Sequence, residues 1–308
     1  LQWLGTLPGA AGQGLVWGLM AIGLYITYKI LDLADLTVDG SICTGAAVCA
    51  VLLTSGVNIW LAMLCSLLAG MLAGLVTGWL HTVFGIPAIL AGILTQLGLW
   101  TINMFIMGLK DGKLISTLTI PSRTSNPLVS AMFLSKALDG SKPFYLYPPL
   151  VMLVLTVVVI ALLYWCFGTE RGASIRAPGA NINMARAQGI NTDANKMIGL
   201  MLANGLVALS GALFAQYNGN AEINMGRGAI VIGLAAIIIG ESIFSNIFRN
   251  FALKLLSVSF GAIIYYIVIQ FVISVLKIDS NYLKLLSAAI VAVFLAVPYW
   301  KQQYFHKK

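Results

Sequence analysis

Polar and ionisable side chains that interrupt apolar stretches are the residues of this sequence that could meet a solute crossing a membrane. Such groups are costly in hydrocarbon, so they usually bond to a neighbouring helix or line a watery passage. A translocation path is therefore one interpretation of this set. The alternative is hydrogen bonding between helices for Gln96, Asn103 and Asn204, and stabilisation of the local backbone for Asp35 and Asp39. For the acidic residue at 241, an ion pair with Arg249 or a local turn is a further alternative. The set is Asp35, Asp39, Gln96, Asn103, Asn204 and Glu241.

A second set of candidate residues lies in the polar stretch 169–196, between two strongly apolar segments. Gly172 and the pair Pro178-Gly179 are expected to break the backbone there. Asn181 or Asn183 can cap a helix start, and Gly189 can close the helix. The predicted helix, 182–188, has about two turns, and so short a helix persists only when it packs against something else. This pattern favours an element that docks on a partner.

Motifs of the common enzymes are absent from the sequence. There is no Walker-type phosphate-binding loop, so the chain is not expected to hydrolyse ATP by itself. The two histidines, His81 and His306, lack the spacing of a zinc site. No nucleophile elbow with a Ser-His-Asp set is visible either. We expect a protein that is not an enzyme and that carries no metal or cofactor of its own.

The composition predicts an integral membrane protein. Hydrophobic residues make up 59% of the 308 residues and charged residues 9%, with a mean hydropathy of +0.92. Charged residues reach about 25% in typical soluble domains. The net charge of +8 comes from Lys and Arg scattered over the joints between apolar segments, which argues against a nucleic-acid partner. Membrane lipid is the expected surrounding.

The hydropathy pattern predicts an all-α, polytopic fold that forms a single domain over residues 1–308. A transmembrane helix needs about 20 predominantly apolar residues, and the chain offers about nine candidates. The second is interrupted at 35–41, and broken helices at membrane depth are tolerated only where protein buries them or a cavity adjoins them. The predicted segments are 13–31, 33–54, 59–84, 87–107, 147–167, 197–217, 228–244, 251–276 and 282–299.

Gly70, Gly74 and Gly78 recur at every fourth position of the third segment. This spacing puts a bare backbone ridge on one helix face, where a second helix can approach closely. Packing within the chain is the favoured interpretation, and an interface between subunits is the alternative.

The spacing of residues in stretch 169–196 resembles the cytoplasmic coupling loop of ABC importer permeases of the branched-chain amino acid and ribose class. Two further stretches, 14–40 and 74–88, look like the first helix with its acidic turn and the third helix with its following Gly-Ile-Pro-Ala of the same permeases. In that family the loop carries a short coupling helix that docks on the ATP-hydrolysing subunit. The matching loop residues are Gly172, Arg176, Ala177, Gly179, Asn181, Ala185, Arg186, Gly189 and Ile190.

The resemblance implies a set of partners. Family members work as a dimer of permeases with two ATP-binding subunits and an extracellular substrate-binding protein. ATP and Mg²⁺ would then bind to the partner ATPase and not to this chain, and Arg186 would be a candidate to meet a carboxylate of that partner. The second permease copy is expected to be identical, which makes a homodimer.

The resemblance also implies a bacterial plasma-membrane location with loop 169–196 in the cytoplasm. The long polar joint, about 109–145, is then extracellular and is our hypothesis for part of the landing surface of the binding protein. The expected function is a translocation path for a small solute, driven by ATP hydrolysis on separate subunits. The solute is expected to be an amino acid, because the chain is similar to permeases of systems that take aromatic amino acids. The alternatives are a sugar or nucleoside importer of the same class and an ion-coupled secondary transporter, which broken helices would also suit.

Overall fold

The computed structural model describes residues 7–110, 113–120, 147–244 and 250–276, and single positions between 288 and 296. Five of the described helices are long and apolar enough to cross a membrane, and α6 with α7 can count as a sixth, bent span. The fold is polytopic and helical, as predicted. The count of nine stays a prediction, because most of 282–299 lies outside the described residues. The helices are α1 (Leu7–Tyr25), its π-helical continuation η2 (Ile26–Ile30), α2 (Val38–Thr54), α3 (Ile59–Thr82), α4 (Ala88–Met107), α6 (Tyr147–Gly168), α7 (Glu170–Ala180), α8 (Ile182–Ala187), α9 (Thr192–Asn218), α10 (Ala229–Phe244) and α11 (Phe251–Leu276).

Helix ends follow local side-chain chemistry. Asn58 and Asn191 begin α3 and α9 by accepting hydrogen bonds from the backbone N–H groups of Trp60 and Ala194. These caps satisfy donors that have no partner within the helix. Gly219 ends α9 in the left-handed conformation, with φ of +73°, which costs glycine least.

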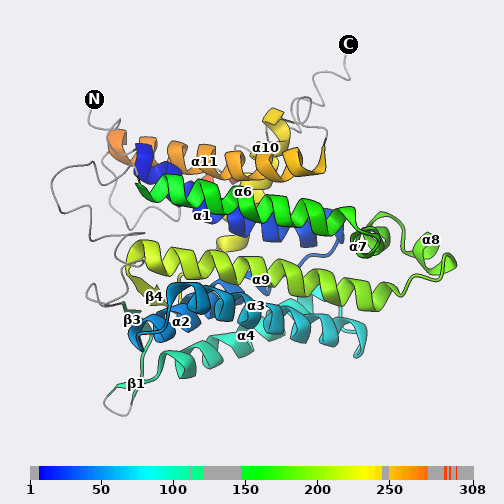
Figure 1. Ribbon diagram of the computed structural model, residues 1–308, viewed down its shortest axis with the longest axis horizontal. Coiled ribbons are helices and arrows are strands. Elements are labelled where there is room, and N and C mark those ends of the chain that lie inside the picture. Colours follow the sequence, from blue (N-terminus) through cyan, green and yellow to red (C-terminus); the bar gives the residue numbers. More distant parts are fainter. Residues whose placement is uncertain are drawn as a thin grey trace.

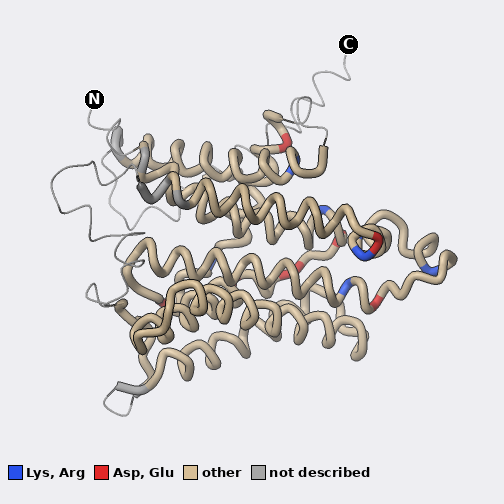
Figure 2. Tube along the Cα trace, in the orientation of Figure 1, with Lys and Arg blue, Asp and Glu red and all other residues tan. Residues whose placement is uncertain are grey.

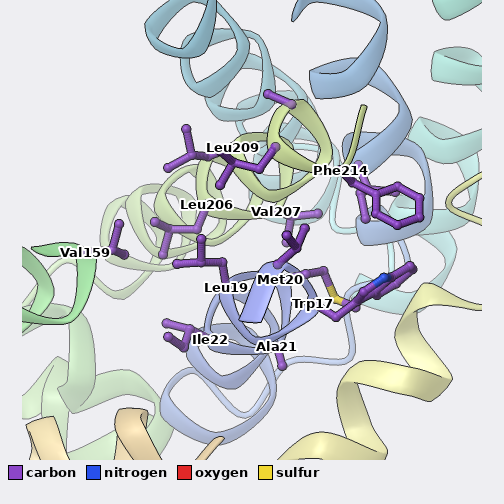
Figure 3. Close-up of a cluster of buried hydrophobic side chains, with 14 of the residues drawn as sticks. Trp17, Leu19, Met20, Ala21, Ile22, Val159, Leu206, Val207, Leu209 and Phe214 are labelled. Carbon is purple, nitrogen blue, oxygen red and sulfur yellow. The ribbon is translucent and has the colours of Figure 1, made fainter. Parts of the chain in front are cut away.

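The hydrophobic core lies where α1 crosses the middle of the bundle beside α9 (Figure 1). Both helices are mostly buried, in contrast to α4 at the edge of the bundle. Figure 3 shows the side chains of α1 and α9 meeting in this core, with Trp17 close to Phe214. The two rings pack edge to face with centroids 5.3 Å apart, a favourable geometry for aromatic pairs.

Helix α2 is a short helix that begins partway along α9. Ser41 near its start bonds to Asn204 in the middle of α9, and Cys49 further along contacts Gln216 near the end of α9. The two helices therefore run in the same direction. The preceding residues 31–37 are not helical apart from a turn, so the second segment is interrupted, as predicted. The predicted bounds of 35–41 are wrong, because α2 begins at Val38 and its first turn includes Asp39, Gly40 and Ser41.

Helix α10 is the counterpart of α2 in the second half of the chain. It follows the irregular segment 219–228, which contains β4 (Asn220–Glu222) and several turns. A Cβ atom on Gly233 would touch Met20 of α1, and Glu241 further along α10 reaches Lys29. Helix α10 therefore runs parallel to α1.

These directions define an internal inverted arrangement. Helices α1 and α9 are antiparallel, because Gly9 lies beside Tyr217 whereas Leu31 lies beside Gly199. The order of long helix, irregular break, short helix and long helix thus occurs twice, in α1–α3 and α9–α11, with opposite directions. The last helix of each half packs along the first helix of the other half, because α3 packs along α9 and α11 packs along α1. Inverted repeats with discontinuous helices are typical of transport proteins.

Short strands form at the end of the bundle opposite α7 and α8 (Figure 1). β1 (Leu109–Lys110) and β2 (Lys113–Leu114) make a small hairpin, and β3 (Thr117–Thr119) pairs antiparallel with β4. None of these strands was predicted from the sequence. The pairing of β3 in particular has no local signal, because its partner lies about 100 residues further along the chain. The rest of that joint, 121–146, lies outside the described residues.

Candidate functional site

Helix α7 departs from α6 at an angle of 83°. Thr169 stands at the corner and accepts a hydrogen bond from the N–H of Gly172, which begins α7. The expected backbone breaks at Gly172 and at Pro178-Gly179 are wrong, because α7 continues as a helix through all three residues. Proline removes one N–H donor, and here it does so in the last turn of the helix.

The glycines of α7 serve close packing instead. A Cβ atom at Gly179 would overlap the carbonyl oxygen of Ile30, and one at Gly172 would overlap the backbone of Cys166 and Phe167. Only a residue without a side chain lets these backbones approach so closely. Helix α7 is thereby fixed against η2 and against the end of α6.

Helix α8 is closed at both ends by residues that the sequence analysis named. Asn181 accepts hydrogen bonds from the N–H groups of Asn183 and Met184. At the other end Gly189 has φ of +76° and donates to Arg186, while Ile190 donates to the carbonyl of Ala185. This pair of bonds is the Schellman motif. A helix of only six residues is thus capped at both ends by its own flanking residues.

Helix α8 projects past the ends of the long helices, at the end of the molecule where most charged residues of the described chain gather (Figures 1 and 2). Ala185 is buried, whereas the apolar side chain of Met184 is 58% exposed. The Arg186 guanidinium donates to Thr192 and lies 3.9 Å from Asp193, with both charged side chains more than half exposed. Arg176 is exposed and Ala177 half-buried. An apolar residue beside a basic one is thus presented outside the bundle.

A buried polar network lies between α2, α9 and the break at 31–37. The amide of Asn204 donates to Asp35 at 2.7 Å and accepts from the Ser41 hydroxyl at 2.6 Å. Asp35 also accepts from the N–H of Thr37. These bonds satisfy the polar atoms of a non-helical stretch inside the bundle. Asp35 and Asn204 are therefore brought together, as partners of each other.

Asp39 connects the two short helices. It lies in the first turn of α2, and its carboxylate accepts hydrogen bonds of 3.1 Å from the N–H groups of Gly228 and Ile230, at the start of α10. The starts of α2 and α10 thus meet at one acidic side chain, and a carboxylate is favoured there because the helix dipoles are positive at that end.

A cavity of about 170 Å³ adjoins Asp39 and is lined by residues of α2, α4 and the connection before α10. It is at the level of Gly40, next to Ser41 and so near the middle of α9. The structure gathers Asp39, Gln96 and Asn103 here, three of the six predicted path residues. The full lining is Asp39, Gly40, Cys43, Gln96, Leu97, Trp100, Asn103, Ile223 and Arg227.

Glu241 lies apart from this cavity. Its carboxylate is 3.2 Å from the ammonium of Lys29, and both side chains are partly exposed. The alternative partner Arg249 lies outside the described residues. An exposed pair of this kind contributes little to stability. Glu241 is therefore best described as one partner of a surface salt bridge between α10 and η2.

The three glycines of α3 face α9. A Cβ atom on Gly70 would overlap Asn204 and Ala208, one on Gly74 would overlap Leu200, and one on Gly78 would overlap Met197. The structure therefore places this ridge at an interface within the chain.

Trp100 and Arg227 are cavity residues that the sequence analysis did not name. Both carried a signal. Trp100 is one turn after Gln96 and nearly one turn before Asn103, so the three share a face of α4. Arg227 closes the Gly- and Asn-rich connection 218–227, which interrupts an otherwise apolar stretch.

Together these features define a class, a polytopic helical membrane protein with an inverted internal arrangement and a short helix outside the bundle. Comparison with known proteins gives the family. The model of the branched-chain amino acid transport system permease component matches residues 7–296, so the chain belongs to this family of ABC importer permeases. No solved structure matches the chain.

Relatives support the same family. A tyrosine transport system permease protein of Clostridioides difficile is 37% identical over 92% of this chain and 88% of its own length. An uncharacterized protein of Rickettsia prowazekii is 33% identical over 95% and 98%. An autoinducer 2 import system permease protein of Photorhabdus luminescens is 30% identical over 76% of this chain and 65% of its own length.

Membership of the family establishes the coarse function. The chain is a membrane subunit of an ABC import system and not its ATPase, it crosses the plasma membrane several times, and such permeases work with ATPase and binding-protein partners.

Proposed function

We propose that the chain forms, with a second identical copy, the path by which a small solute, an amino acid, crosses the membrane. ATP and Mg²⁺ bind to the partner ATPases, and the substrate is delivered from the side of β1–β4 by a binding protein. The amino-acid assignment is supported by the tyrosine transport relative, which is similar over most of both chains. The autoinducer 2 relative covers less of this chain.

Helix α8 is the observation that carries the coupling part of the proposal. It is capped at both ends, lies outside the bundle and exposes Met184 beside Arg186. Its link to the rest of the chain is through α7, whose Gly179 packs directly on η2. A push on α8 by the ATPase therefore reaches the end of α1, because closely packed elements move together. In this arrangement α7 and α8 lie in the cytoplasm.

The test is affinity purification of the chain from its native cell in mild detergent. The variant carries Met184→Asp and Arg186→Glu, which replace an apolar contact by a charge and reverse a second charge. The control is Glu222→Lys in β4, a charge reversal at the opposite end of the bundle. We expect the wild type and the control to retain an ATPase subunit and the double variant to lose it. Retention by the double variant, with folding intact, would contradict the docking role of α8.

A further inference from the structure

The cavity beside Asp39 combines chemical groups that rarely occur together at membrane depth. It is lined by one carboxylate, one guanidinium, two amides and one indole ring. Charged side chains inside a membrane usually face a functional passage and have a partner there. The composition of this cavity therefore raises the question of which ligand would pair with each group.

The side chain of Asn103 has an oxygen atom beside the cavity without a hydrogen-bond partner in the part of the chain that the structure describes. The residue is fully buried, and its Nδ2 atom lies 3.5 Å from the carbonyl oxygen of Gly40. This contact orients the amide, since a flipped amide would put two oxygens together. The Oδ1 atom is then left without a hydrogen-bond partner among the described residues. A buried acceptor in this state is costly, and a donor from a ligand or water would relieve it.

Arg227 and Asp39 supply opposite charges on the same cavity. Arg227 is exposed and makes no ion pair with the residues that the structure describes. Asp39 already accepts two backbone hydrogen bonds, but a carboxylate has about four acceptor positions. The guanidinium of Arg227 could thus pair with an anionic group of a ligand. The carboxylate of Asp39 and the Oδ1 atom of Asn103 could accept hydrogen bonds from a cationic group.

Trp100 gives the cavity an aromatic wall. The residue is 44% exposed and lies on α4 beside Leu97, which is also exposed. Aromatic rings pack favourably against one another in offset or edge-to-face geometry. A ligand with a ring could therefore extend along α4 while its polar end stays in the cavity.

We propose that this cavity is a transient binding site for a zwitterionic aromatic amino acid in passage. The carboxylate pairs with Arg227, the ammonium donates to Asn103 Oδ1 and to Asp39, and the ring lies beside Trp100. This assignment rests on the amino-acid function proposed above. The volume of about 170 Å³ is below the roughly 300–1,000 Å³ of pockets for drug-sized ligands, which suits a weak stop on a path.

The test measures binding of radiolabelled L-tyrosine to the full chain with its ATPase subunits in lipid nanodiscs, without the binding protein. Competitors are tyramine, which lacks the carboxylate, and 3-(4-hydroxyphenyl)propionate, which lacks the ammonium. Variants are Arg227→Ala, Asn103→Leu and Trp100→Ala, with Trp100→Phe as rescue. Matched controls are Lys254→Ala on α11 and Asn224→Ala, both exposed and absent from the cavity lining.

We expect the wild type to prefer L-tyrosine over each analogue by about tenfold or more, since hydrogen bonds to charged groups are the stronger kind. Arg227→Ala should weaken L-tyrosine about tenfold and leave tyramine unchanged. Asn103→Leu should do the same for L-tyrosine and leave the propionate unchanged. Trp100→Ala should weaken all three ligands, and Trp100→Phe should restore them. Simple misfolding cannot produce these selective losses.

ATP-driven uptake by the complete system, measured in parallel, separates two failures. Uptake of L-tyrosine by the wild type together with unaltered selectivity in the variants would overturn the site and leave the proposed function standing. Absence of uptake for every amino acid by an assembled wild type would overturn both.

Discussion

Asn204 joins parts of the chain that lie more than 160 residues apart. One amide group bonds to Asp35 through its nitrogen and to Ser41 through its oxygen. Both bonds are buried, so neither partner can turn to water if the amide is lost. The irregular stretch before α2 therefore depends on a single side chain of α9.

Replacing Asn204 by Leu should lower the free energy of unfolding by about 1–3 kcal/mol, the cost of leaving buried polar groups unpaired. The measurement is thermal unfolding of the purified chain in detergent. Asn224→Ala is the control, because Asn224 is exposed and its backbone bonding is unaltered. Equal melting of the two variants would show that the network contributes no stability.

Asn103 and Gln96 line the cavity, whereas Asn204 lies in the buried network, although all three are amides in apolar segments. The sequence could not separate them from Asn204, since composition does not say which polar group finds a partner inside the chain. Only the packing of α2 between α4 and α9 decides it. The six path residues thus divide into a network, a cavity and the surface ion pair of Glu241.

Glycine positions decide how closely elements approach. Gly74→Ala should destabilise the chain by about 1–3 kcal/mol through overpacking, because its Cβ would overlap the backbone of Leu200 in α9. Gly98→Ala is the matched change on α4, where nothing lies within 4 Å of the added atom. It should stabilise by about 0.5–1 kcal/mol through helix propensity. Thermal unfolding compares the two, and effects of the same sign would contradict the argument.

The stability of the very short helix α8 should depend on the residues that cap its two ends. Gly189→Ala forces a side chain into a left-handed conformation, and Asn181→Ala removes the cap at the other end. Each should cost α8 about 1 kcal/mol. Hydrogen exchange of the α8 amides should accelerate about fivefold for each variant, with Asn183→Ala as control. Unchanged exchange would show that neither end holds the helix.

The elements that were predicted correctly from the sequence are those fixed by local signals. Apolar length gave the long spans, Asn181 and Gly189 gave both ends of α8, and the acidic turn gave the break before α2. The continuous helix α7 was missed because Gly179 is required there by contact with Ile30, a neighbour about 150 residues away. The inverted arrangement was also missed, since it appears only when helix directions are known.

The outer face of α4 bears on the assembly of the whole molecule. The cavity with Asp39 and Arg227 is lined by Leu97 and Trp100, two exposed residues of α4, and lipid is a poor neighbour for charged groups. In the proposed homodimer we expect the second copy to cover this face, so that the two cavities face one shared passage.

Cross-linking between copies tests this arrangement. Leu97→Cys on α4 and Leu153→Cys on α6 introduce thiols at exposed positions, in a background with Cys65 and Cys166 replaced by Ser. A short bifunctional maleimide in native membranes should join two copies at position 97, by at least about fivefold over position 153. The reverse preference would place the second copy against α6 and would remove the shared passage.

The hydrogen bond between Asp39 and Ile230 can form only after both residues have been synthesised. The two residues are 191 positions apart, and ribosomes add about 5–20 residues per second. Asp39 thus waits roughly 10–40 s before the N–H groups that satisfy it have been made. During that interval the start of α2 has no α10 to cap, so the first half of the chain enters the membrane unfinished.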